Sequence, residues 1–279
     1  MYTKLKIVFL SLLLSGCGTQ FVYNNITLIS PWYVDDYVDL NRDQMKRFKA
    51  HLRELQAWHR DSELPRYREV LVNIQGQLAN PELESQALLA QLYRMSDAWD
   101  VIVQQATPAV VELSQSLTDA QRTQLFEAME RRNQERLEKG DSDKQPRQAW
   151  IERIEKWMGR LSDTQQHLVA EYADSVPNMD ELTVAAHRNF QARLFELMEQ
   201  SLMADYGARM GVLLAGAMDS DEGRLLEQAR QQQLQERVEL FVELWRRADD
   251  SQRRKVLKKL AGYQKDVEAL MQAPQAKAA

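Results

Sequence analysis

The sequence contains few of the residues that cross-link a chain or interrupt its helices. Among 279 residues there are one cysteine, ten glycines and seven prolines. A single cysteine excludes an intrachain disulfide, so the stability of the fold must come from apolar packing. A composition poor in glycine and rich in Gln, Glu, Leu and Arg is typical of a helical protein.

Motifs that would indicate an enzyme are also missing. The chain has no G-x-x-x-x-G-K-[ST] or G-x-G-x-x-G nucleotide loop, no G-x-S-x-G elbow and no H-E-x-x-H zinc motif. Its net charge of −5 gives no overall attraction to nucleic acid. We therefore expect no cofactor, no nucleic-acid partner and a non-enzymatic protein.

The chain has only four histidines, and they limit what a metal site could contain. His59 and Glu63 are four residues apart, and His51 and Glu54 are three apart. Both spacings place the two side chains on one helix face, but two ligands alone do not hold a metal. We expect surface His–Glu pairs and no metal site.

The N-terminus has the order of a secretory signal. Lys4 and Lys6 precede an apolar run from Ile7 to Leu14. A charged segment followed by a short apolar run is typical of an export signal. The run is far shorter than the roughly 20 residues that a membrane-spanning helix needs. We expect residues 1–16 to be removed as a signal peptide.

The sequence LSGC, which ends at Cys17, resembles the bacterial lipobox. In that motif the signal is cut before the cysteine, here between Gly16 and Cys17, and the thiol receives a diacylglyceryl group. The alternative is a signal peptide with an incidental cysteine. Gly18 in place of Asp resembles enterobacterial lipoproteins sent to the outer membrane rather than retained at the inner one. Several acyl chains on Cys17 would anchor the protein durably.

The lipobox has consequences for the mature protein. Cleavage before Cys17 leaves 263 residues and removes Lys4 and Lys6, which changes the formal charge from −5 to −7. Residues 17–20 form a very short tether, so we expect the body to lie against the membrane. The last residues, 273–279, are expected to form a flexible tail.

Helical periodicity dominates the remainder of the chain. Met45, Phe48, Leu52 and Leu55 follow one another at intervals of three and four residues, as the apolar stripe of a helix does. No alternating strand pattern occurs. We predict an all-α fold of about nine or ten helices in one domain over 21–272, as a bundle or curved array. Breaks are expected near Pro65, 79–82, 139–146, 175–180 and 218–223, with a kink at Pro108.

One short phrase recurs four times, as LNRDQ, LTDAQ, LSDTQ and ADDSQ. Each phrase places a short polar residue three positions before a glutamine, which is the capping box of a helix start. Four independent helix starts would suffice to explain the phrases. The predicted caps are Asn41/Gln44, Thr118/Gln121, Ser162/Gln165 and Asp249/Gln252.

The spacing of the four phrases also suggests a duplication. The first and third phrases are 121 residues apart, and the second and fourth are 131 apart. Nearly equal separations favour two degenerate helical repeats, with possible halves at 40–140 and 150–270.

Two resemblances follow from these residues. The phrases LTDAQ and LSDTQ resemble the L-T-x-x-Q motif of the small periplasmic helical chaperones of the Spy and CpxP type. The lipobox, residues 24–44, residues 58–67 and residues 153–165 together resemble a family of proteobacterial helical lipoproteins of unknown function. These resemblances imply a helical lipoprotein on the periplasmic face of the outer membrane. The most specific activity that they imply is chaperone-like holding of client proteins.

The stretch PWYVDDYVDL at 31–40 is the densest unusual segment. It is either a surface for a protein partner or a set of aromatic residues that fill the core beside acids that cap a helix. An envelope enzyme that uses Asp35, Asp36 and Asp39 with His51 or His59 is the main alternative function. A lipid or lipopolysaccharide contact through the basic segment 253–259 is another. The candidate partner surface comprises Trp32, Tyr33, Asp35, Asp36, Tyr37 and Asp39.

Overall fold

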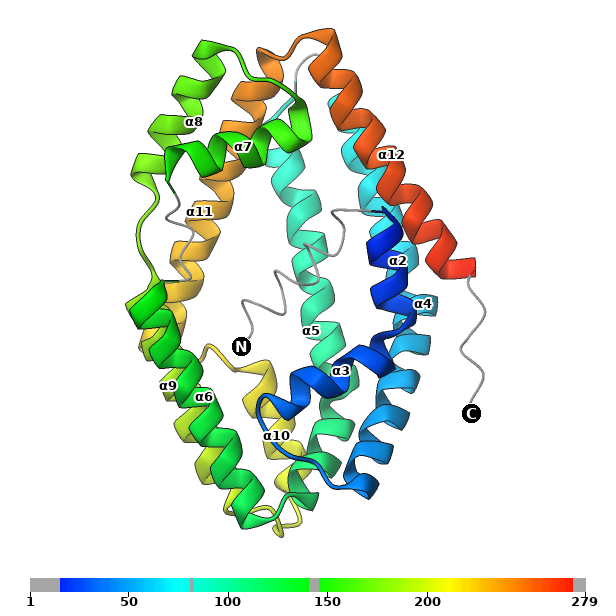
Figure 1. Ribbon diagram of the computed structural model, residues 1–279, viewed down its shortest axis with the longest axis vertical. Helices are drawn as coiled ribbons and strands as arrows, with labels where there is room; N and C mark the ends of the chain where they lie inside the picture. The colour runs from blue at the N-terminus through cyan, green and yellow to red at the C-terminus, as the bar shows by residue number, and fades with distance from the viewer. Residues whose placement is uncertain (1–15, 81–82, 141–145, 273–279) are drawn as a thin grey trace.

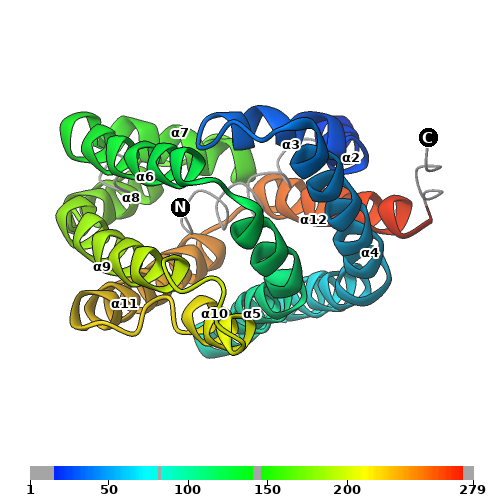
Figure 2. The same ribbon diagram turned by 90° about the horizontal axis from the view of Figure 1, so that it is seen from below.

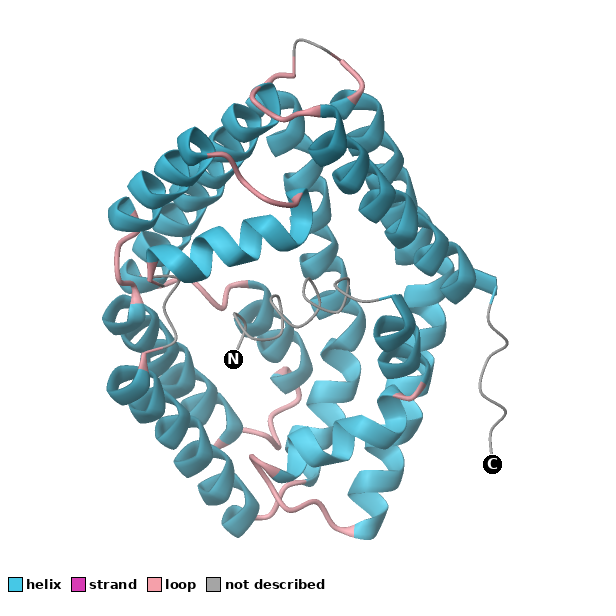
Figure 3. Cartoon of the chain, turned by 45° about the horizontal axis from the view of Figure 1, so that its top comes forward, coloured by secondary structure: helices cyan, strands magenta, loops and turns pink. Residues whose placement is uncertain are grey.

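The computed structural model describes residues 16–80, 83–140 and 146–272, and every regular element in these ranges is a helix (Figure 3). The predicted all-α class is therefore confirmed. Within these ranges the helices are α2 (Gly16–Asn24), α3 (Ile26–Asp35), α4 (Arg42–Leu78), α5 (Ser85–Ser116), α6 (Asp119–Lys139), α7 (Arg147–Met158), α8 (Asp163–Ser175), α9 (Asp180–Met198), α10 (Tyr206–Ala215), α11 (Asp221–Arg246) and α12 (Asp250–Gln272).

The helices form an elongated array (Figure 1). Helices α4, α12 and α2 lie on one side of the long axis, α6, α8, α9 and α11 lie on the other, and α5 runs between them. Helices α4 and α6 begin at one end of the array, whereas α8 and α12 begin at the opposite end. None of the helices in the described ranges combines the length and the apolar character needed to cross a bilayer.

The array has two apolar cores. The larger core joins the second half of α4 and the first half of α5 to α7, α8, α11 and α12, and includes Val169, Trp245 and Tyr263. The smaller core joins α6, α9 and α10 to the end of α5 and the segment before α4, and includes Met129, Phe190 and Met210. Buried apolar side chains supply the stability that disulfides cannot supply here.

Helix breaks follow the sequence in most places. Interruptions occur after Leu78 and Lys139, at 176–179 between α8 and α9, and at 216–220 between α10 and α11. Pro65 does not begin a new helix, because α4 continues unbroken through it. The break at 199–205 between α9 and α10 is one that we did not predict.

Residues 1–15 of the predicted signal peptide 1–16, and the predicted tail 273–279, lie outside the described residues. The expected tether 17–20 does not form an extended link, because these residues belong to helix α2.

All four predicted glutamine caps are present. The side chains of Asn41, Thr118 and Ser162 accept the backbone N–H of the glutamine three residues later, and that glutamine accepts the N–H of its own cap residue. Asp249 and Gln252 make the same two bonds, at 2.8 and 3.2 Å. The four boxes therefore satisfy backbone donors at four helix starts.

The glutamines of these boxes also pair with one another, which the sequence did not predict. Nε2 of Gln44 donates to Oε1 of Gln121 at 3.0 Å, and Nε2 of Gln121 donates back to Oε1 of Gln44 at 2.8 Å. Gln165 and Gln252 form the same reciprocal pair, at 3.0 and 2.9 Å. We call these pairs the 44–121 clasp and the 165–252 clasp.

Each clasp also holds the backbone just before a partner helix. Gln44 donates to the carbonyl of Ser116, and Gln121 donates to the carbonyl of Asp39, both at 2.7 Å. Gln252 donates in the same way to the carbonyl of Arg160 at 2.8 Å. In these bonds the carbonyl belongs to the residue two positions before the partner's N-cap. Each of these glutamine side chains thus caps its own helix, bonds to the paired glutamine and holds the backbone segment that precedes the partner helix.

The order of helices between the two glutamines of each clasp is consistent with the predicted duplication, which stays a prediction. Between Gln44 and Gln121 the chain forms α4 and α5, and the second box opens α6. Between Gln165 and Gln252 it forms α8 to α11, and the second box opens α12. The second half would then contain broken versions of α4 and α5.

Replacing a buried clasp glutamine should destabilise the whole fold. Gln165 is 1% exposed, so Gln165→Ala leaves the amide of Gln252 partly unpaired in a buried site. We expect a loss of about 2–4 kcal/mol in the free energy of unfolding, measured by chemical denaturation. The exposed Gln235→Ala is the matched control and should change it by less than about 0.5 kcal/mol.

The pairing itself is tested by a double-mutant cycle. The cost of Gln165→Ala/Gln252→Ala should be smaller than the sum of the two single costs, because either single change already breaks the shared bonds. Strictly additive costs would show that the two amides act independently.

Candidate functional site

The segment 31–40 divides into an exposed half and an attached half. Trp32 and Tyr33 are 73% and 62% exposed, and no residue of α3 is buried. Val38 is buried in the smaller core, with Tyr37 packed against that core. The interpretation of all these aromatic residues as core is therefore wrong for Trp32 and Tyr33.

The acidic residues of this segment attach it to α6. The carboxylate of Asp36 accepts from Arg132 at 2.6 Å, and the Arg132 guanidinium lies 5.7 Å from the centre of the Tyr37 ring. The backbone N–H of Asp39 donates to Gln124 at 2.9 Å. Residues 36–39 thus form a brace between the start of α4 and helix α6.

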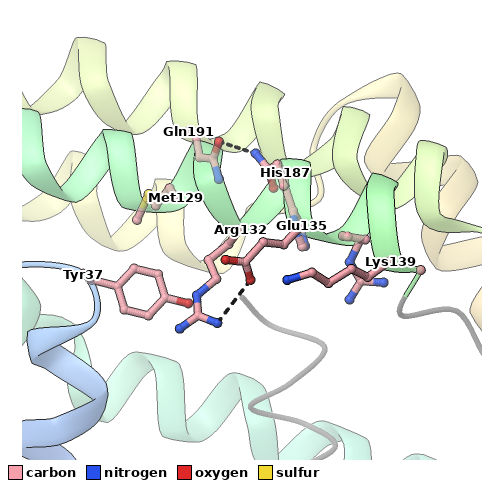
Figure 4. A pocket seen from close by; sticks show the side chains of 10 residues that line it. Tyr37, Met129, Arg132, Glu135, Lys139, His187 and Gln191 are labelled. Carbon is pink, nitrogen blue, oxygen red and sulfur yellow. Dashed lines mark hydrogen bonds and ion pairs between the residues drawn. The ribbon is translucent and has the colours of Figure 1, made fainter.

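A small cavity of about 160 Å³ lies beside this brace, between α6 and α9 (Figure 4). Arg132, which lines it, is paired with Glu135 and Asp36, and Arg136 forms a buried ion pair with Asp180 at 2.9 Å. Pockets for small organic ligands usually measure about 300–1,000 Å³. The size of the cavity and its internally paired charges favour a structural role over a substrate site.

His59 and Glu63 do not form the expected surface pair. They are 5% and 2% exposed, and His59 contacts Tyr23 of α2. The hydroxyl of Tyr23 lies 3.1 Å from Nδ1 of His59, and the carboxylate of Glu63 pairs with Arg66 at 3.2 Å. Burial lowers the pKa of His59 to about 4, so the imidazole is neutral at pH 7.

The remaining histidines differ in their surroundings, and one of them, His187, lines the same cavity as Tyr37. His51 binds Glu112 at 2.7 Å and Glu54 at 3.6 Å, and His167 pairs with Glu171 on an exposed surface. Burial, with the nearby positive charge of Arg136, lowers the pKa of His187 to about 3. Across the described ranges no three His, Cys, Asp or Glu side chains gather as a metal site would require.

The basic segment 253–259 uses several of its cations within the fold. Arg253 lies 5.6 Å from the Trp245 ring centre, and Lys259 lies 4.9 Å from that of Trp157. Lys255 donates to the carbonyl of Glu155 at 3.0 Å. Arg253 and Lys259 thus cover aromatic residues of the larger core. Three of the cations that a lipid-contact surface would use are therefore engaged within the fold.

Two apolar side chains project from the turn between α9 and α10. Leu202 is 99% exposed and Met203 is 56% exposed. We call them the apolar tip. The sequence SLMAD contains no periodic signal that would have predicted either the turn or the exposure of these residues.

The turn that carries the apolar tip is held in place on both sides. Gln115, near the end of α5, donates to the carbonyl of Ser201 at 2.9 Å, and Arg122 of α6 donates to its hydroxyl at 3.3 Å. Tyr206 is buried after the turn, and its hydroxyl bonds to Ser114 at 2.8 Å. Leu202 and Met203 are therefore presented by a fixed turn.

Comparison with known proteins identifies the family. The profile of a family of unknown function, DUF6279, matches residues 36–219. The chain belongs to this family. The match contains the brace, the 44–121 clasp and the apolar tip. No curated protein and no solved structure matches the chain.

The buried His59 predicts that the protein loses stability in mild acid. The unfolded chain takes up a proton at the ordinary histidine pKa of 6.5, whereas folded His59 does so only near pH 4. Between these values the unfolded state binds more protons, so the free energy of unfolding should fall by about 3 kcal/mol from His59 alone. Urea unfolding measured from pH 7 to pH 4 gives this slope.

His59→Leu should reduce that pH dependence by the contribution of His59, about 3 kcal/mol between pH 7 and pH 4, while the contribution of the buried His187 remains. His167→Leu, at an exposed position, is the control and should leave the slope unchanged. A His59→Leu protein with the full wild-type slope would contradict the assignment.

Proposed function

We propose that this protein is a lipid-anchored helical binding protein of the cell envelope, attached through Cys17 to the periplasmic face of the outer membrane. Supporting the anchor are the LSGC sequence at Leu14–Cys17, the preceding signal pattern and the absence of any other cysteine. Asp36 pairs with Arg132 and His51 pairs with Glu112, so both side chains are engaged with other residues, which supports a binding protein over the enzyme alternative.

The observation that carries the binding function is the apolar tip. A fully exposed leucine beside an exposed methionine loses the roughly 1.5–3 kcal/mol that burying each such side chain would yield. Methionine adapts to partners of different shape. A fixed turn that displays both residues is suited to insertion into an apolar pocket of a protein partner.

A chaperone-like protein would use the same tip to hold unfolded envelope proteins. Its clients would be apolar segments, which bind without a unique shape. Suppression of the aggregation of an unrelated unfolded protein at near-equal amounts would indicate this activity. A single partner protein would indicate a scaffold instead.

The lipid anchor is tested by labelling cells with palmitate. The wild-type chain should incorporate the label and sediment with outer membranes, whereas Cys17→Ser should incorporate none. Labelling of the Cys17→Ser chain would disprove attachment at this residue.

The apolar tip is tested by photocrosslinking in cells. A photoreactive residue at the exposed position Ala204, next to the tip, should form an adduct with an envelope protein. Leu202→Ser/Met203→Ser should reduce the adduct about tenfold or more, since apolar burial of two side chains is lost. The same photoreactive residue at Leu225, which is 56% exposed on α11, is the control.

Both serine replacements are at exposed positions, so the free energy of unfolding should change by less than about 0.5 kcal/mol. An adduct that is unaffected by Leu202→Ser/Met203→Ser would contradict the proposed binding surface.

A further inference from the structure

The outward face of α2 and α3 is apolar, whereas the outward face of a surface helix is ordinarily polar. The exposed large apolar residues are Phe21 of α2 and Leu28 and Trp32 of α3. Their exposed fractions are 64%, 66% and 73%. We call these three residues the outer stripe, and Tyr33, 62% exposed, lies beside it.

The segment that carries the outer stripe has no charge. Not one Asp, Glu, Lys or Arg occurs from Gly16 to Val34, although 28% of the chain is charged and nineteen average residues would carry about five. A charged side chain strongly opposes entry into the apolar region of a bilayer. The segment from Gly16 to Val34 contains no charged side chain that would oppose such entry.

The inner side of α2 is attached to the body by hydrogen bonds. Gln20 donates to Asp266 of α12 at 2.8 Å, and Arg60 of α4 donates to Asn24 at 3.2 Å. Gln56 donates to the carbonyl of Tyr23, whose hydroxyl contacts His59 at 3.1 Å. The outer stripe is therefore a fixed surface of the folded protein.

We propose that the outer stripe is a membrane-contact surface, which lies in the interface between lipid headgroups and acyl chains. The inference rests on the proposed lipid anchor, because Cys17 precedes Phe21 by one helical turn in α2, an axial distance of about 6 Å. Trp and Tyr are the side chains that favour this interface, since each combines an apolar ring with a polar group. Amphipathic helices in this setting bury their apolar face by about 5–10 Å.

The contact would fix the orientation of the body on the membrane. Seen along the long axis, α2 and α3 lie along one edge of the molecule and α10 lies along the opposite edge (Figure 2). Acyl chains alone permit rotation about the anchor, whereas a second contact restricts it. With the outer stripe in the lipid, the edge that carries α10 faces away from the membrane and remains accessible.

The experiment uses the mature chain with Cys17→Ser, so that lipid attachment does not mask weaker binding. Flotation with phosphatidylcholine vesicles should recover part of the protein. Leu28→Asp/Trp32→Asp should reduce the bound fraction about tenfold, because two apolar side chains leave the interface and two charges enter it. Leu225→Asp, at another exposed apolar position, should leave binding unchanged.

Two further results distinguish lipid from other ligands. Because the segment has no cation, phosphatidylglycerol in the vesicles should not strengthen binding, and salt should not weaken it. In the full lipidated chain, a photoreactive residue at position 32 should form adducts with phospholipid. Adducts with a protein instead, or vesicle binding that Leu28→Asp/Trp32→Asp does not reduce, would overturn the inference.

Failure of the anchor and failure of the outer stripe are separable. Palmitate incorporation at Cys17 reports only on the anchor, and vesicle binding of the Cys17→Ser chain reports only on the outer stripe. A Cys17→Ser chain that does not float with vesicles would overturn the membrane-contact surface and leave the anchor intact. Circular dichroism of each aspartate variant should match the wild type, since the replaced side chains are exposed.

Discussion

The structure depends on the reciprocal pairing of glutamine side chains at helix starts. In each clasp an amide oxygen accepts both its own cap N–H and the partner amide, while the amide nitrogen donates to the partner and to a backbone carbonyl. The polar groups of a buried amide are thereby satisfied, which is the condition under which such a group stabilises a fold. One clasp joins α4 to α6 and the other joins α8 to α12, at opposite ends of the long axis. The four local capping boxes thus also supply two tertiary contacts, one at each end of the array.

The capping boxes could be predicted from the sequence, whereas the pairing of their glutamines could not. A capping box links residues three positions apart, so Thr118 and Gln121 reveal it in the sequence. The partner of Gln121 is 77 residues away, and no local rule selects it. The same limit applies to His59, where helical spacing to Glu63 was evident but the covering helix α2 was not. Leu202 was missed because the exposure of a turn residue is set by what packs around it, here Gln115, Arg122 and the buried Tyr206.

Helix α2 links the buried polar groups with the proposed membrane surface. Its inner side covers His59 and Arg60, which are each 5% exposed, and its outer side presents Phe21. Polar side chains are thus buried on one side of α2 while the ring of Phe21 is exposed on the other, which reverses the usual distribution. In the proposed membrane contact, lipid would cover this exposed ring. The polar contacts to Tyr23 and Asn24 then hold the helix at a defined position between lipid and protein.

The extent of the family match separates two parts of the molecule. The smaller core, from Val38 to Ala217, lies wholly within residues 36–219, as do the 44–121 clasp and the apolar tip. The outer stripe lies before that range, and the 165–252 clasp closes beyond it, at Gln252. The proposed binding through the tip therefore depends on the part of the chain that matches the family, because Ser201 is held by α5 and α6 and the start of α6 is held by the 44–121 clasp. The proposed membrane contact depends in part on α2, which is held by α12 from outside that range, through Gln20 and Asp266, and by α4 from within it, through Asn24 and Arg60. The two proposed surfaces thus use different side-chain contacts, but both depend on the position of α4.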